Sequence, residues 1–538
     1  MNFIEEKIEK KIGETGVKPV FRFPPENNGL LHLGHAKAIN LNFGLAEKYN
    51  STCHLRLDDT NPLTEDKKFT DSIIEDIKWL GYDFDVRYTS DYFNDIKNCA
   101  LSLIEKGLAY VDKSTSEEIA EMKGSHTEPG KASKYRDVSI NENLMLFNGM
   151  LKGDYEPGSM TLRAKIDMSS PNMIFRDPVI YRIIGKEHDR VGNFYAYPTY
   201  DFAHPLSDYY DGVTDSLCTL EFDVHRPLYN WVLDNCIDDI NRPEQTEFNR
   251  LIVDGNVLSK RHVKKLIDDE NVDINSWDDP RLLTLKGLRR RGYTPSSIKK
   301  FVEKSGYTKR NTSTDLKLLE HFLRTELNET AHRYMGVSEP IKLTIKNWDK
   351  GTEWVTVENN PENSEDGKRT IPFSNELWIE KDDFRIEANK KYNRLKLNGE
   401  VRLKGAYVVK AVDYVLDDNG EVVEVICTYD PDTKSGTQID RKIKGTIHWC
   451  SVEHSPGVEF REYDDLFIED VDADIKGTLM INKESLIIKK GYVEINCVNL
   501  RKTPIQFMRK GYYILDKDSE NDSLVFNKTV SLREGKWK

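Results

Sequence analysis

The 538-residue sequence predicts an α/β protein with an all-β C-terminal part. Three observations lead to this fold class. Strands and helices alternate over residues 18–80, residues 251–331 are mainly helical, and short alternating apolar and polar runs dominate after about residue 332. At roughly 100–200 residues per domain, the chain has room for three to five domains.

The α/β pattern begins with an apolar strand at residues 18–23, which ends at Pro24. Helical spacing of apolar residues starts at about Gly34. A second strand follows at residues 53–57, and a second amphipathic helix ends near Gly81. Strands that alternate with helices in this way are parallel, and parallel sheets bind ligands at the carboxyl ends of their strands. The turns that follow the two strands are therefore candidate binding loops.

The regular alternation of strands and helices stops over residues 93–199, where helices mix with short strands such as residues 161–165 and 175–183. An α/β character returns over residues 200–250. In the C-terminal part, Asp418-Asn419-Gly420 lies between apolar and β-branched residues and predicts a tight hairpin. We expect β-barrels there.

Composition excludes several classes of protein. No apolar run approaches the roughly 20 residues that a membrane span requires, and the charged N-terminus lacks the apolar core of a signal peptide. We therefore expect a cytoplasmic protein without membrane contact. The seven cysteines form no CxxC pair, so neither a zinc ribbon nor a disulfide framework is expected.

The net charge of −13 argues against a protein that coats nucleic acid indiscriminately. Two local basic clusters, at residues 259–265 and 286–293, are compatible with a defined RNA-binding surface. Taken alone, such a basic run more often forms an ordinary solvated helix face.

Two histidines, His32 and His35, stand at the start of the first predicted helix. A helix N-terminus presents N–H groups and a positive dipole end to phosphate, and Gly34 allows a ligand to approach the backbone. The histidines would add donors for developing negative charge. The alternatives are two ordinary helix-start histidines, or a metal site, for which no third ligand lies at suitable spacing. Lys260, in the distant segment 257–261, would complete a phosphate site, although such a loop is also a common surface feature.

These residues resemble the motifs of a known family. His32-Leu-Gly-His35 resembles the HIGH motif of class I aminoacyl-tRNA synthetases, and Val257-Leu-Ser-Lys-Arg261 resembles a degenerate KMSKS loop. Further stretches narrow the resemblance to the glutaminyl/glutamyl group, and within it to the glutaminyl enzymes: Arg56-Leu-Asp-Asp-Thr-Asn-Pro62, Tyr200-Asp-Phe-Ala-His-Pro205, Ser216-Leu-Cys-Thr-Leu-Glu-Phe222, Trp277-Asp-Asp-Pro-Arg281 and Gly287-Leu-Arg-Arg-Arg-Gly-Tyr293. The similarity runs from about residue 17 to the end, and the short charged start suggests the bacterial type.

The resemblance implies a Rossmann-type catalytic domain with an acceptor-end insertion, a helical stem-contact domain and two C-terminal β-barrels that bind the anticodon. The implied boundaries are an arm at 1–16, Rossmann halves at 17–92 and 200–250, the insertion at 93–199, the helical domain at 251–331 and the barrels at 332–538. The implied reaction activates glutamine with ATP and its accompanying Mg²⁺, and then transfers it to the terminal 2′-OH of tRNA(Gln). The family is usually monomeric, and it requires bound tRNA for activation.

The resemblance also implies site residues. The catalytic residues would be His32, His35 and Lys260. ATP contacts would come from Glu26, Asn28, Gly29, His32, Gly34, His35, Leu258, Ser259 and Lys260. Glutamine contacts would come from Arg22, Asp58, Tyr200 and Cys218. Contacts to tRNA would come from Arg289, Arg290, Arg291, Arg333, Arg394, Lys404, Gln506, Arg509 and Lys528.

The glutamine contacts have assigned roles. Asp58 would bind the α-ammonium group, Arg22 would lie near the carboxylate, and Tyr200 would hydrogen-bond the side-chain amide. The alternatives are a capping aspartate for Asp58 and a packed aromatic ring for Tyr200. Glutamyl enzymes tend to place arginine at the position of Cys218, so a neutral thiol there favours glutamine over glutamate.

Two departures from the family pattern qualify the interpretation. Asn27 replaces a turn proline, which reduces the rigidity of the turn. Val224 occupies the place of an acidic residue that reads the acceptor stem, with Asp223 one residue earlier. Two rival hypotheses remain: a glutamyl-tRNA synthetase of relaxed tRNA specificity, and a non-catalytic tRNA-binding relative.

Overall fold

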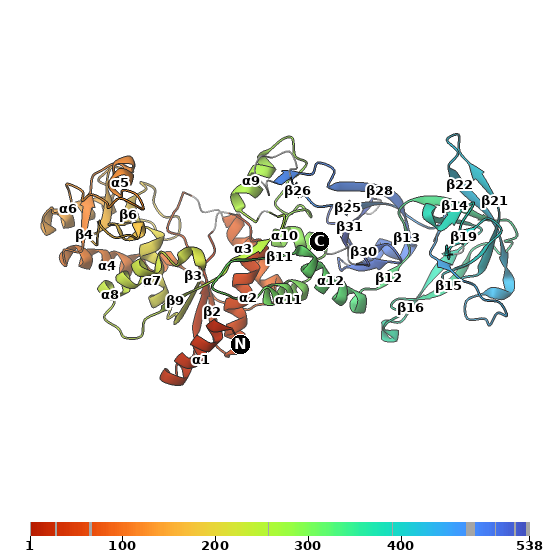
Figure 1. Cartoon of the computed structure of the whole chain (residues 1–538), viewed down its shortest axis with the longest axis horizontal. Coiled ribbons are helices and arrows are strands. Elements are labelled where there is room, and N and C mark those ends of the chain that lie inside the picture. The colour runs from red at the N-terminus through yellow and green to blue at the C-terminus, as the bar shows by residue number, and fades with distance from the viewer. Residues whose placement is uncertain are drawn as a thin grey trace. The chain divides into compact units, whose positions relative to one another are not determined.

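The computed structural model describes residues 2–26, 29–63, 67–256, 258–389, 391–469, 479–500, 502–520 and 523–533. The chain forms two compact units (Figure 1). Unit 1 contains residues 1–252 and 302–314, and unit 2 contains residues 253–301 and 315–538.

Unit 1 is built on parallel strands. Strands β1 (Val20–Phe23), β2 (Thr52–Leu57) and β3 (Val86–Tyr88) form one parallel sheet, with Phe21 opposite Cys53. Strands β8 (Asp215–Thr219) and β9 (Glu244–Phe248) form a second parallel pair. The connecting helices are α2 (Leu33–Lys48), α3 (Lys67–Trp79), α7 (Tyr200–Tyr210) and α8 (Arg226–Cys236). The predicted alternation of parallel strands and helices is confirmed.

The two parallel groups meet where β8 lies beside β1. The Thr214 N–H donates to Val20 O at 3.0 Å, and the Arg22 guanidinium of β1 donates to Leu217 O of β8 at 2.9 Å. From β1 the chain continues to β2 and β3, whereas from β8 it continues to β9. This reversal of direction is a topological switch point, where open parallel sheets bind their ligands.

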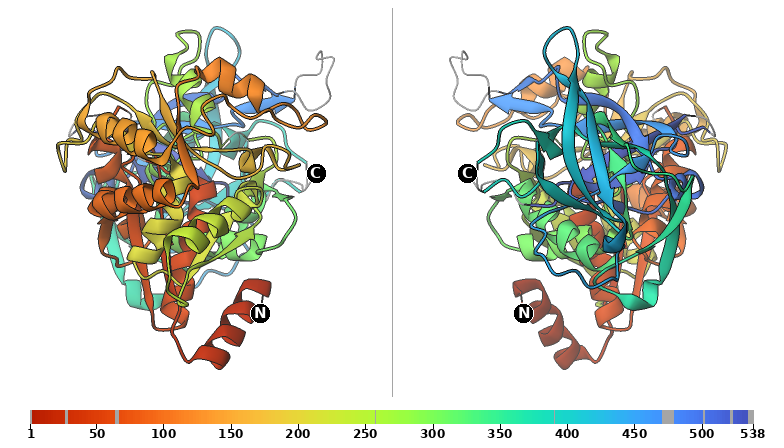
Figure 2. Two further views of the ribbon diagram at one scale, coloured as in Figure 1. Left: turned by 90° about the vertical axis from the view of Figure 1, so that its left-hand side faces the viewer. Right: turned by 90° about the vertical axis from the view of Figure 1, so that its right-hand side faces the viewer.

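The N-terminal arm is the helix α1 (Phe3–Thr15), drawn in red in Figure 2. Its Ile4 and Ile8 are buried, and Lys7 donates to Thr246 of β9 at 2.7 Å. The helix begins with a capping box between Asn2 and Glu5, because each side chain satisfies a backbone N–H of the other. The charged arm is therefore docked on unit 1.

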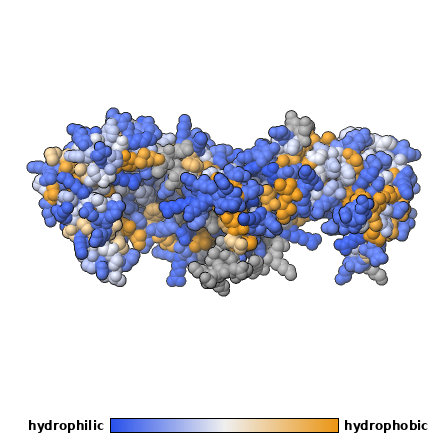
Figure 3. Space-filling model, turned by 90° about the horizontal axis from the view of Figure 1, so that it is seen from above, coloured by the Kyte–Doolittle hydropathy of each residue, from blue (hydrophilic) through white to orange (hydrophobic). Residues whose placement is uncertain are grey.

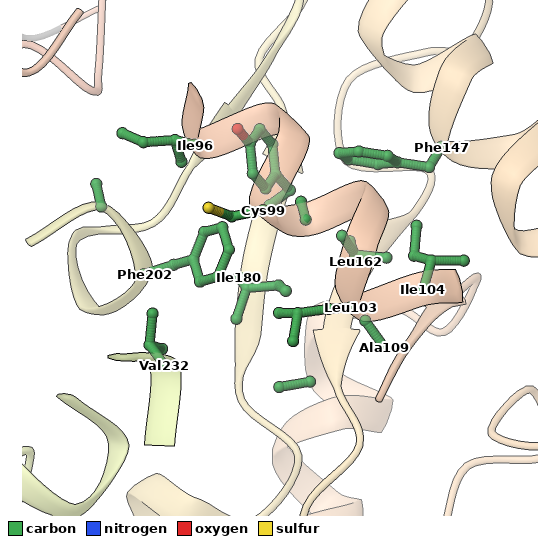
Figure 4. Packing of buried hydrophobic residues seen from close by; sticks show 14 of the residues in the cluster. Ile96, Cys99, Leu103, Ile104, Ala109, Phe147, Leu162, Ile180, Phe202 and Val232 are labelled. Carbon is green, nitrogen blue, oxygen red and sulfur yellow. The ribbon is translucent and has the colours of Figure 1, made fainter. Parts of the chain in front are cut away.

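A four-stranded antiparallel sheet lies within the 93–199 region. Its elements are α4 (Phe93–Glu105), β4 (Ala109–Asp112), α5 (Ser116–Met122), α6 (Ile140–Lys152), β5 (Thr161–Ala164), β6 (Val179–Ile183) and β7 (Ala196–Pro198). Figure 4 shows part of the core that these elements share with α7 and α8, including Cys99, Phe147, Leu162, Ile180, Phe202 and Val232. The two strand-like segments predicted here are confirmed as β5 and β6.

The helical region contributes to both units. Its elements are β10 (Leu251–Val253), α9 (Lys260–Asp268), α10 (Leu285–Arg291), α11 (Pro295–Ser305), β11 (Thr312–Thr314) and α12 (Leu316–Thr330). Residues 302–314 return to unit 1, where the Asn249 side chain accepts the Thr308 N–H at 2.9 Å. In unit 2, α10 ends at Gly292, whose φ of 94° is left-handed. A Cβ atom at this position would meet Thr529 of β31 (Leu524–Val530) and Ile514 of β30 (Gly511–Leu515).

The C-terminal part contains two seven-stranded sheets. The first consists of β12 (Arg333–Tyr334), β13 (Gly336–Val337), β25 (Gly457–Tyr463), β28 (Leu486–Val493), β29 (Ile505–Phe507), β30 (Gly511–Leu515) and β31 (Leu524–Val530). The second consists of β14 (Pro340–Ile345), β17 (Glu376–Glu380), β20 (Glu400–Leu403), β21 (Val408–Leu416), β22 (Val422–Asp430), β23 (Thr446–Ile447) and β24 (Cys450–Ser451). Short pairs are β15 (Glu353–Glu358) with β16 (Lys368–Phe373), β18 (Phe384–Arg385) with β19 (Leu395–Lys396), and β26 (Phe467–Glu469) with β27 (Leu479–Ile481).

The two barrel-like bodies are nested in the sequence. Strands β12 and β13 belong to the first sheet, the chain then completes the second sheet, and it returns to the first at β25. The predicted hairpin joins β21 to β22, with Gly420 at φ 79°, and can be followed in the right-hand view of Figure 2. The face in Figure 3 is mostly hydrophilic, with hydrophobic residues in separate areas. No helix in the described ranges is both long and apolar enough to span a membrane.

Candidate active site and RNA-contacting residues

The two motif histidines form the N-terminal cap of α2. The Nδ1 atom of His32 accepts the Gly34 N–H at 3.1 Å, and the Nδ1 atom of His35 accepts the His32 N–H at 3.1 Å. The rings lie 3.9 Å apart between centroids. Because each Nδ1 atom accepts a hydrogen bond, the proton of each neutral ring lies on Nε2. The helix start therefore combines backbone N–H groups, a positive dipole end and two Nε2 donors.

The turns after β1 and β2 lie side by side. Glu26 and Asp58 form an isolated parallel bridge, which brings the two predicted binding loops together. Asp58 accepts the Thr60 N–H at 3.2 Å and is partly exposed, so it caps its turn and remains accessible. Gly29 is buried, whereas the expected ATP contact Asn28 lies outside the described residues.

The start of α7 and the segment after β8 form one wall of the candidate site. Tyr200 is the first residue of α7 and packs against His204 and Phe222, with ring centroids 5.0 and 5.6 Å away. Burial raises the pKa of Tyr200 well above its usual value, and the neighbouring charges include Cys218, Arg22 and Asp58. The four residues expected to bind glutamine are therefore close to one another.

Arg22 lies inside this wall. Its side chain is 0% exposed, and its guanidinium donates to Asp208 at 3.1 Å, to Ser216 at 2.6 Å and to the Cys218 sulfur at 3.4 Å. These hydrogen bonds are all made within the protein, so the buried guanidinium holds β1 and β8 together beside Tyr200. Burial raises the pKa of the Cys218 thiol, but the Arg22 charge and His204 outweigh it and lower that pKa.

Asp208 is the centre of a buried ionic network that sequence reasoning missed. It contacts Arg22, Arg56 at 2.5 Å and His204 at 3.0 Å, and it accepts the Tyr229 hydroxyl at 3.0 Å. Burial would raise its pKa, yet the two arginines hold that pKa well below its usual value. The spacing of Asp208 and His204 on one face of α7 was the available sequence signal, but it did not distinguish a network from a salt bridge.

The network is closed by a second carboxylate. Arg56 also contacts Asp211 at 3.3 Å, and Asp211 accepts the Tyr92 hydroxyl at 2.6 Å. Two buried guanidinium groups are thus matched by two carboxylates. The absence of net charge around Cys218 therefore depends on the matching of these arginines by carboxylates, as well as on the neutral thiol.

The KMSKS-like segment lies in unit 2. Lys260 is the first residue of α9, and Ser259 is its N-cap, while Val257 lies outside the described residues. The apolar face of α9 is buried through Val263 and Leu266, which pack with Leu466 from the start of β26. Leu258 precedes the helix and is partly buried. The helix start has the same elementary features that attract phosphate at α2.

The three arginines of α10 have different surroundings. Arg289 is exposed. Arg290 donates to both carboxylate oxygens of Asp516 at 2.9 Å and to Asp518 at 2.7 Å. Arg291 donates to Lys528 O at 3.3 Å and lies over the Tyr463 ring at 5.1 Å. The bidentate ion pair places Arg290 at the contact between α10 and the first barrel sheet.

The other expected RNA contacts also divide by burial. Arg333 is 5% exposed and donates to Ala331 O and Asn328 O, so its side chain closes the end of α12. Arg509 pairs with Asp383 at 2.5 Å, and Arg394 lies 3.4 Å from the same carboxylate. The remaining candidates are partly exposed or exposed: Arg394, Lys404, Gln506, Arg509 and Lys528.

The described residues contain no group of three or more His, Cys, Asp or Glu side chains that could hold a metal ion.

Comparisons with known proteins agree with this architecture. Residues 18–329 match the catalytic domain of tRNA synthetases class I (E and Q), and residues 331–430 and 446–516 match anticodon-binding domains of the same group. Similar relatives include glutamine–tRNA ligases of Cronobacter sakazakii (49% identity over 99% of this chain and 97% of that protein) and Idiomarina loihiensis (48%, covering 99% and 96%). The glutamine–tRNA ligase of Clostridium perfringens is 48% identical, covering 99% and 97%. The chain therefore belongs to the class I tRNA synthetases of the E and Q group.

Proposed function

We propose that this chain is a glutamine–tRNA ligase, which activates glutamine with ATP and transfers it to the terminal 2′-OH of tRNA(Gln). One observation carries the proposal. The phosphate-attracting start of α2 follows the same turn that pairs with Asp58, and Asp58 neighbours the charge-balanced wall of Tyr200, Cys218 and Arg22. The relatives named as glutamine–tRNA ligases over nearly their whole length support the same activity.

The first step needs charge stabilisation on phosphate. The glutamine carboxylate attacks the α-phosphate of ATP, forming glutaminyl-adenylate and releasing pyrophosphate. In this proposal the Nε2 donors of His32 and His35, with the N–H groups of α2, stabilise the charge that develops on the phosphate oxygens. Lys260 adds a cation to the leaving phosphates, and Mg²⁺ enters with ATP. Glu26, Gly29 and Gly34 line the approach to the nucleotide.

The glutamine pocket selects an uncharged side chain. In the proposal, Asp58 binds the α-ammonium group and the Tyr200 hydroxyl bonds the side-chain amide. The raised pKa of Tyr200 keeps that hydroxyl neutral, so it can donate and accept hydrogen bonds. Arg22 acts as a positioning residue, because its charge is already matched by Asp208. A glutamate carboxylate entering this wall would find no unmatched cation.

Transfer requires that one tRNA contact both the catalytic domain and the anticodon-binding domains. We assign residues 93–199 to the acceptor end, residues 251–331 to the inside of the tRNA, and residues 332–538 to the anticodon. Exposed Arg289 is the leading phosphate contact on α10. The partly exposed side chains of the barrels are suited to unpaired anticodon bases, which are read through their edges. A monomeric, cytoplasmic enzyme is part of this proposal.

The decisive test is pyrophosphate exchange with glutamine and with glutamate, each with and without a tRNA(Gln) transcript. Exchange with glutamine alone, and only in the presence of tRNA, is the expected result. Exchange with glutamate would instead indicate a glutamyl-tRNA synthetase. Absence of exchange under every condition, with tRNA still bound, would leave a non-catalytic tRNA-binding protein.

The role of Lys260 is tested separately with Lys260→Ala. Adenylate formation should slow at least 100-fold, as for the loss of one charge-stabilising group, whereas tRNA affinity should change little. Lys265→Ala, on the same helix and distant from its start, is the matched control. Equal losses of adenylate formation and tRNA affinity in Lys260→Ala would remove the catalytic assignment.

A further inference from the structure

A loop at residues 186–191, between β6 and β7, is hydrogen-bonded to the turn that follows β2. The Lys186 ammonium donates to Pro62 O, at the far end of this turn, at 2.9 Å. The His188 ring lies against the near end of the turn, where its Nε2 atom is 2.9 Å from Asp59 O. The loop therefore contacts two carbonyl groups of a turn that lies more than a hundred residues earlier in the chain.

Contacts within the loop fix the orientation of the His188 ring. Its Nδ1 atom accepts the Arg190 N–H at 3.2 Å and the Val191 N–H at 3.4 Å. Because an imidazole nitrogen that accepts a hydrogen bond carries no proton, the proton lies on Nε2, which donates to Asp59 O. The residue is 3% exposed, and its ring packs edge-on against Phe93, with the centroids 5.3 Å apart. His188 therefore donates to the turn from one fixed position.

The side chain of Asp59 ties the same loop and turn to the segment after β3. Asp59 is 2% exposed, and its carboxylate accepts both the N–H group, at 2.8 Å, and the hydroxyl of Ser90. Arg190, from the loop, donates to that hydroxyl at 2.9 Å and pairs with Asp91 at 2.5 Å. The loop, the turn and the segment after β3 thus form one hydrogen-bonded unit around Asp59.

Asp58, the residue expected to bind the α-ammonium group of glutamine, precedes Asp59 in this turn. Its backbone pairs with Glu26 on one side, and the carbonyl of the next residue is held by His188 on the other. We propose that His188 is a positioning residue, which holds the turn so that the Asp58 carboxylate meets the ammonium group. This inference rests on the proposed ligase activity. When the hydrogen bond is lost, the turn leaves its position in part of the population, and the apparent affinity for glutamine falls by the fraction that remains.

The test compares His188→Asn with His188→Gln in the full-length chain. The glutamine amide can reach Asp59 O as the Nε2 atom does, whereas the shorter asparagine amide ends near the position of Nδ1. With tRNA(Gln) present, the KM for glutamine in pyrophosphate exchange should rise about tenfold in His188→Asn, as for the loss of one hydrogen bond. The rise should be smaller in His188→Gln, and the KM for ATP should be nearly unchanged in both variants.

Two comparisons separate positioning from a general loss of structure. Asp58→Asn removes the partner of the ammonium group, so adding His188→Asn to it should raise the KM for glutamine little further, whereas independent effects would add. Phe147→Leu is the matched control, because Phe147 is 0% exposed in the core of the same region. It should lower the melting temperature and leave the KM for glutamine unchanged.

The outcomes distinguish this inference from the proposed function. Absence of exchange in the unmodified chain would refute the ligase activity and the role of His188 with it. If the unmodified chain is active, an unchanged KM for glutamine in His188→Asn, or equal increases in His188→Asn and His188→Gln, would overturn the role of His188 alone. Additive losses in the double variant, or the same increase in Phe147→Leu, would overturn it as well.

Discussion

Replacing Asp208 with asparagine tests the buried network behind the glutamine pocket. The carboxylate contacts Arg22 at 3.1 Å, Arg56 at 2.5 Å and His204 at 3.0 Å, and its side chain is 0% exposed. Asparagine preserves the shape but removes the charge. Two buried guanidinium groups are then left with Asp211 as their remaining carboxylate in the network.

The expected loss of stability is large. Removing one partner of a buried ion pair costs about 3–5 kcal/mol, because the opposite charge stays buried without compensation. For a unit of this size, each kcal/mol lowers the melting temperature by about 2 °C, so the transition of unit 1 should fall by roughly 6–10 °C. Because the pKa of Asp208 is depressed in the folded state, its contribution is present above a pH of about 4 and is lost as the pH falls.

The same substitution should weaken discrimination against glutamate. A unit positive charge about 8 Å from a substrate carboxylate contributes about 2 kcal/mol at an effective dielectric constant of about 20, or roughly a 30-fold change. The ratio of pyrophosphate exchange with glutamine to that with glutamate, measured with tRNA, should fall by about this factor.

The control is Asp234→Asn, which breaks an exposed ion pair of 2.7 Å with Arg242 in the same unit. Exposed pairs contribute about 0–1 kcal/mol, so both melting and specificity should be nearly unchanged. If Asp208→Asn melts within about 2 °C of the unmodified chain and keeps its preference for glutamine, charge balance does not maintain the pocket, and the reasoning fails.

Three further predictions concern unit 2. Gly292→Ala should lower the melting temperature, because the left-handed φ of 94° strains alanine by about 1 kcal/mol and its Cβ would lie 2.5 Å from Thr529; a variant that melts normally would contradict this. Glu380→Gln should cost about 3 kcal/mol at neutral pH: burial opposes ionisation, but His448, Lys510 and the Ser338 N–H lower the pKa of Glu380 to about 2. The contribution of Glu380 to stability is present above a pH of about 4.5 and is lost toward pH 2. The melting temperature of the variant should therefore change less with acid pH than that of the unmodified chain, and parallel curves for the two proteins would refute this assignment. Arg289→Ala should reduce the salt dependence of tRNA binding by about one phosphate contact with normal melting, whereas Arg290→Ala should mainly lower the melting temperature, and the reverse pattern would exchange their assignments.

The local elements of the fold were predictable because their causes are local. Apolar periodicity and the proline and glycine boundaries predicted β1, α2 and β2, and Asn419-Gly420 predicted the β21–β22 hairpin. The resemblance predicted two C-terminal barrels. It did not predict that β12 and β13 pair with strands more than a hundred residues later, because strand pairing across long loops leaves no periodic signal in either segment.

The local structure around the candidate site was predictable where it depends on neighbouring residues. Sequence by itself determined that His32 and His35 cap a helix at the carboxyl end of a strand, because helix capping and strand–helix alternation are local properties. It also placed Tyr200 and Cys218 in one pocket through the family resemblance. Sequence treated Arg290 and Arg333 like Arg289, since residue type alone does not reveal ion pairing or burial.

Only the tertiary structure decided what surrounds these residues. Asp208 balances arginines contributed by β1 and β2, which lie more than a hundred residues earlier in the chain. This arrangement depends on burial and on distances of a few ångströms, which change the strength of a charge. The side chain determines which chemistry a residue can perform, whereas its charge state and its partners depend on the neighbours that folding brings to it.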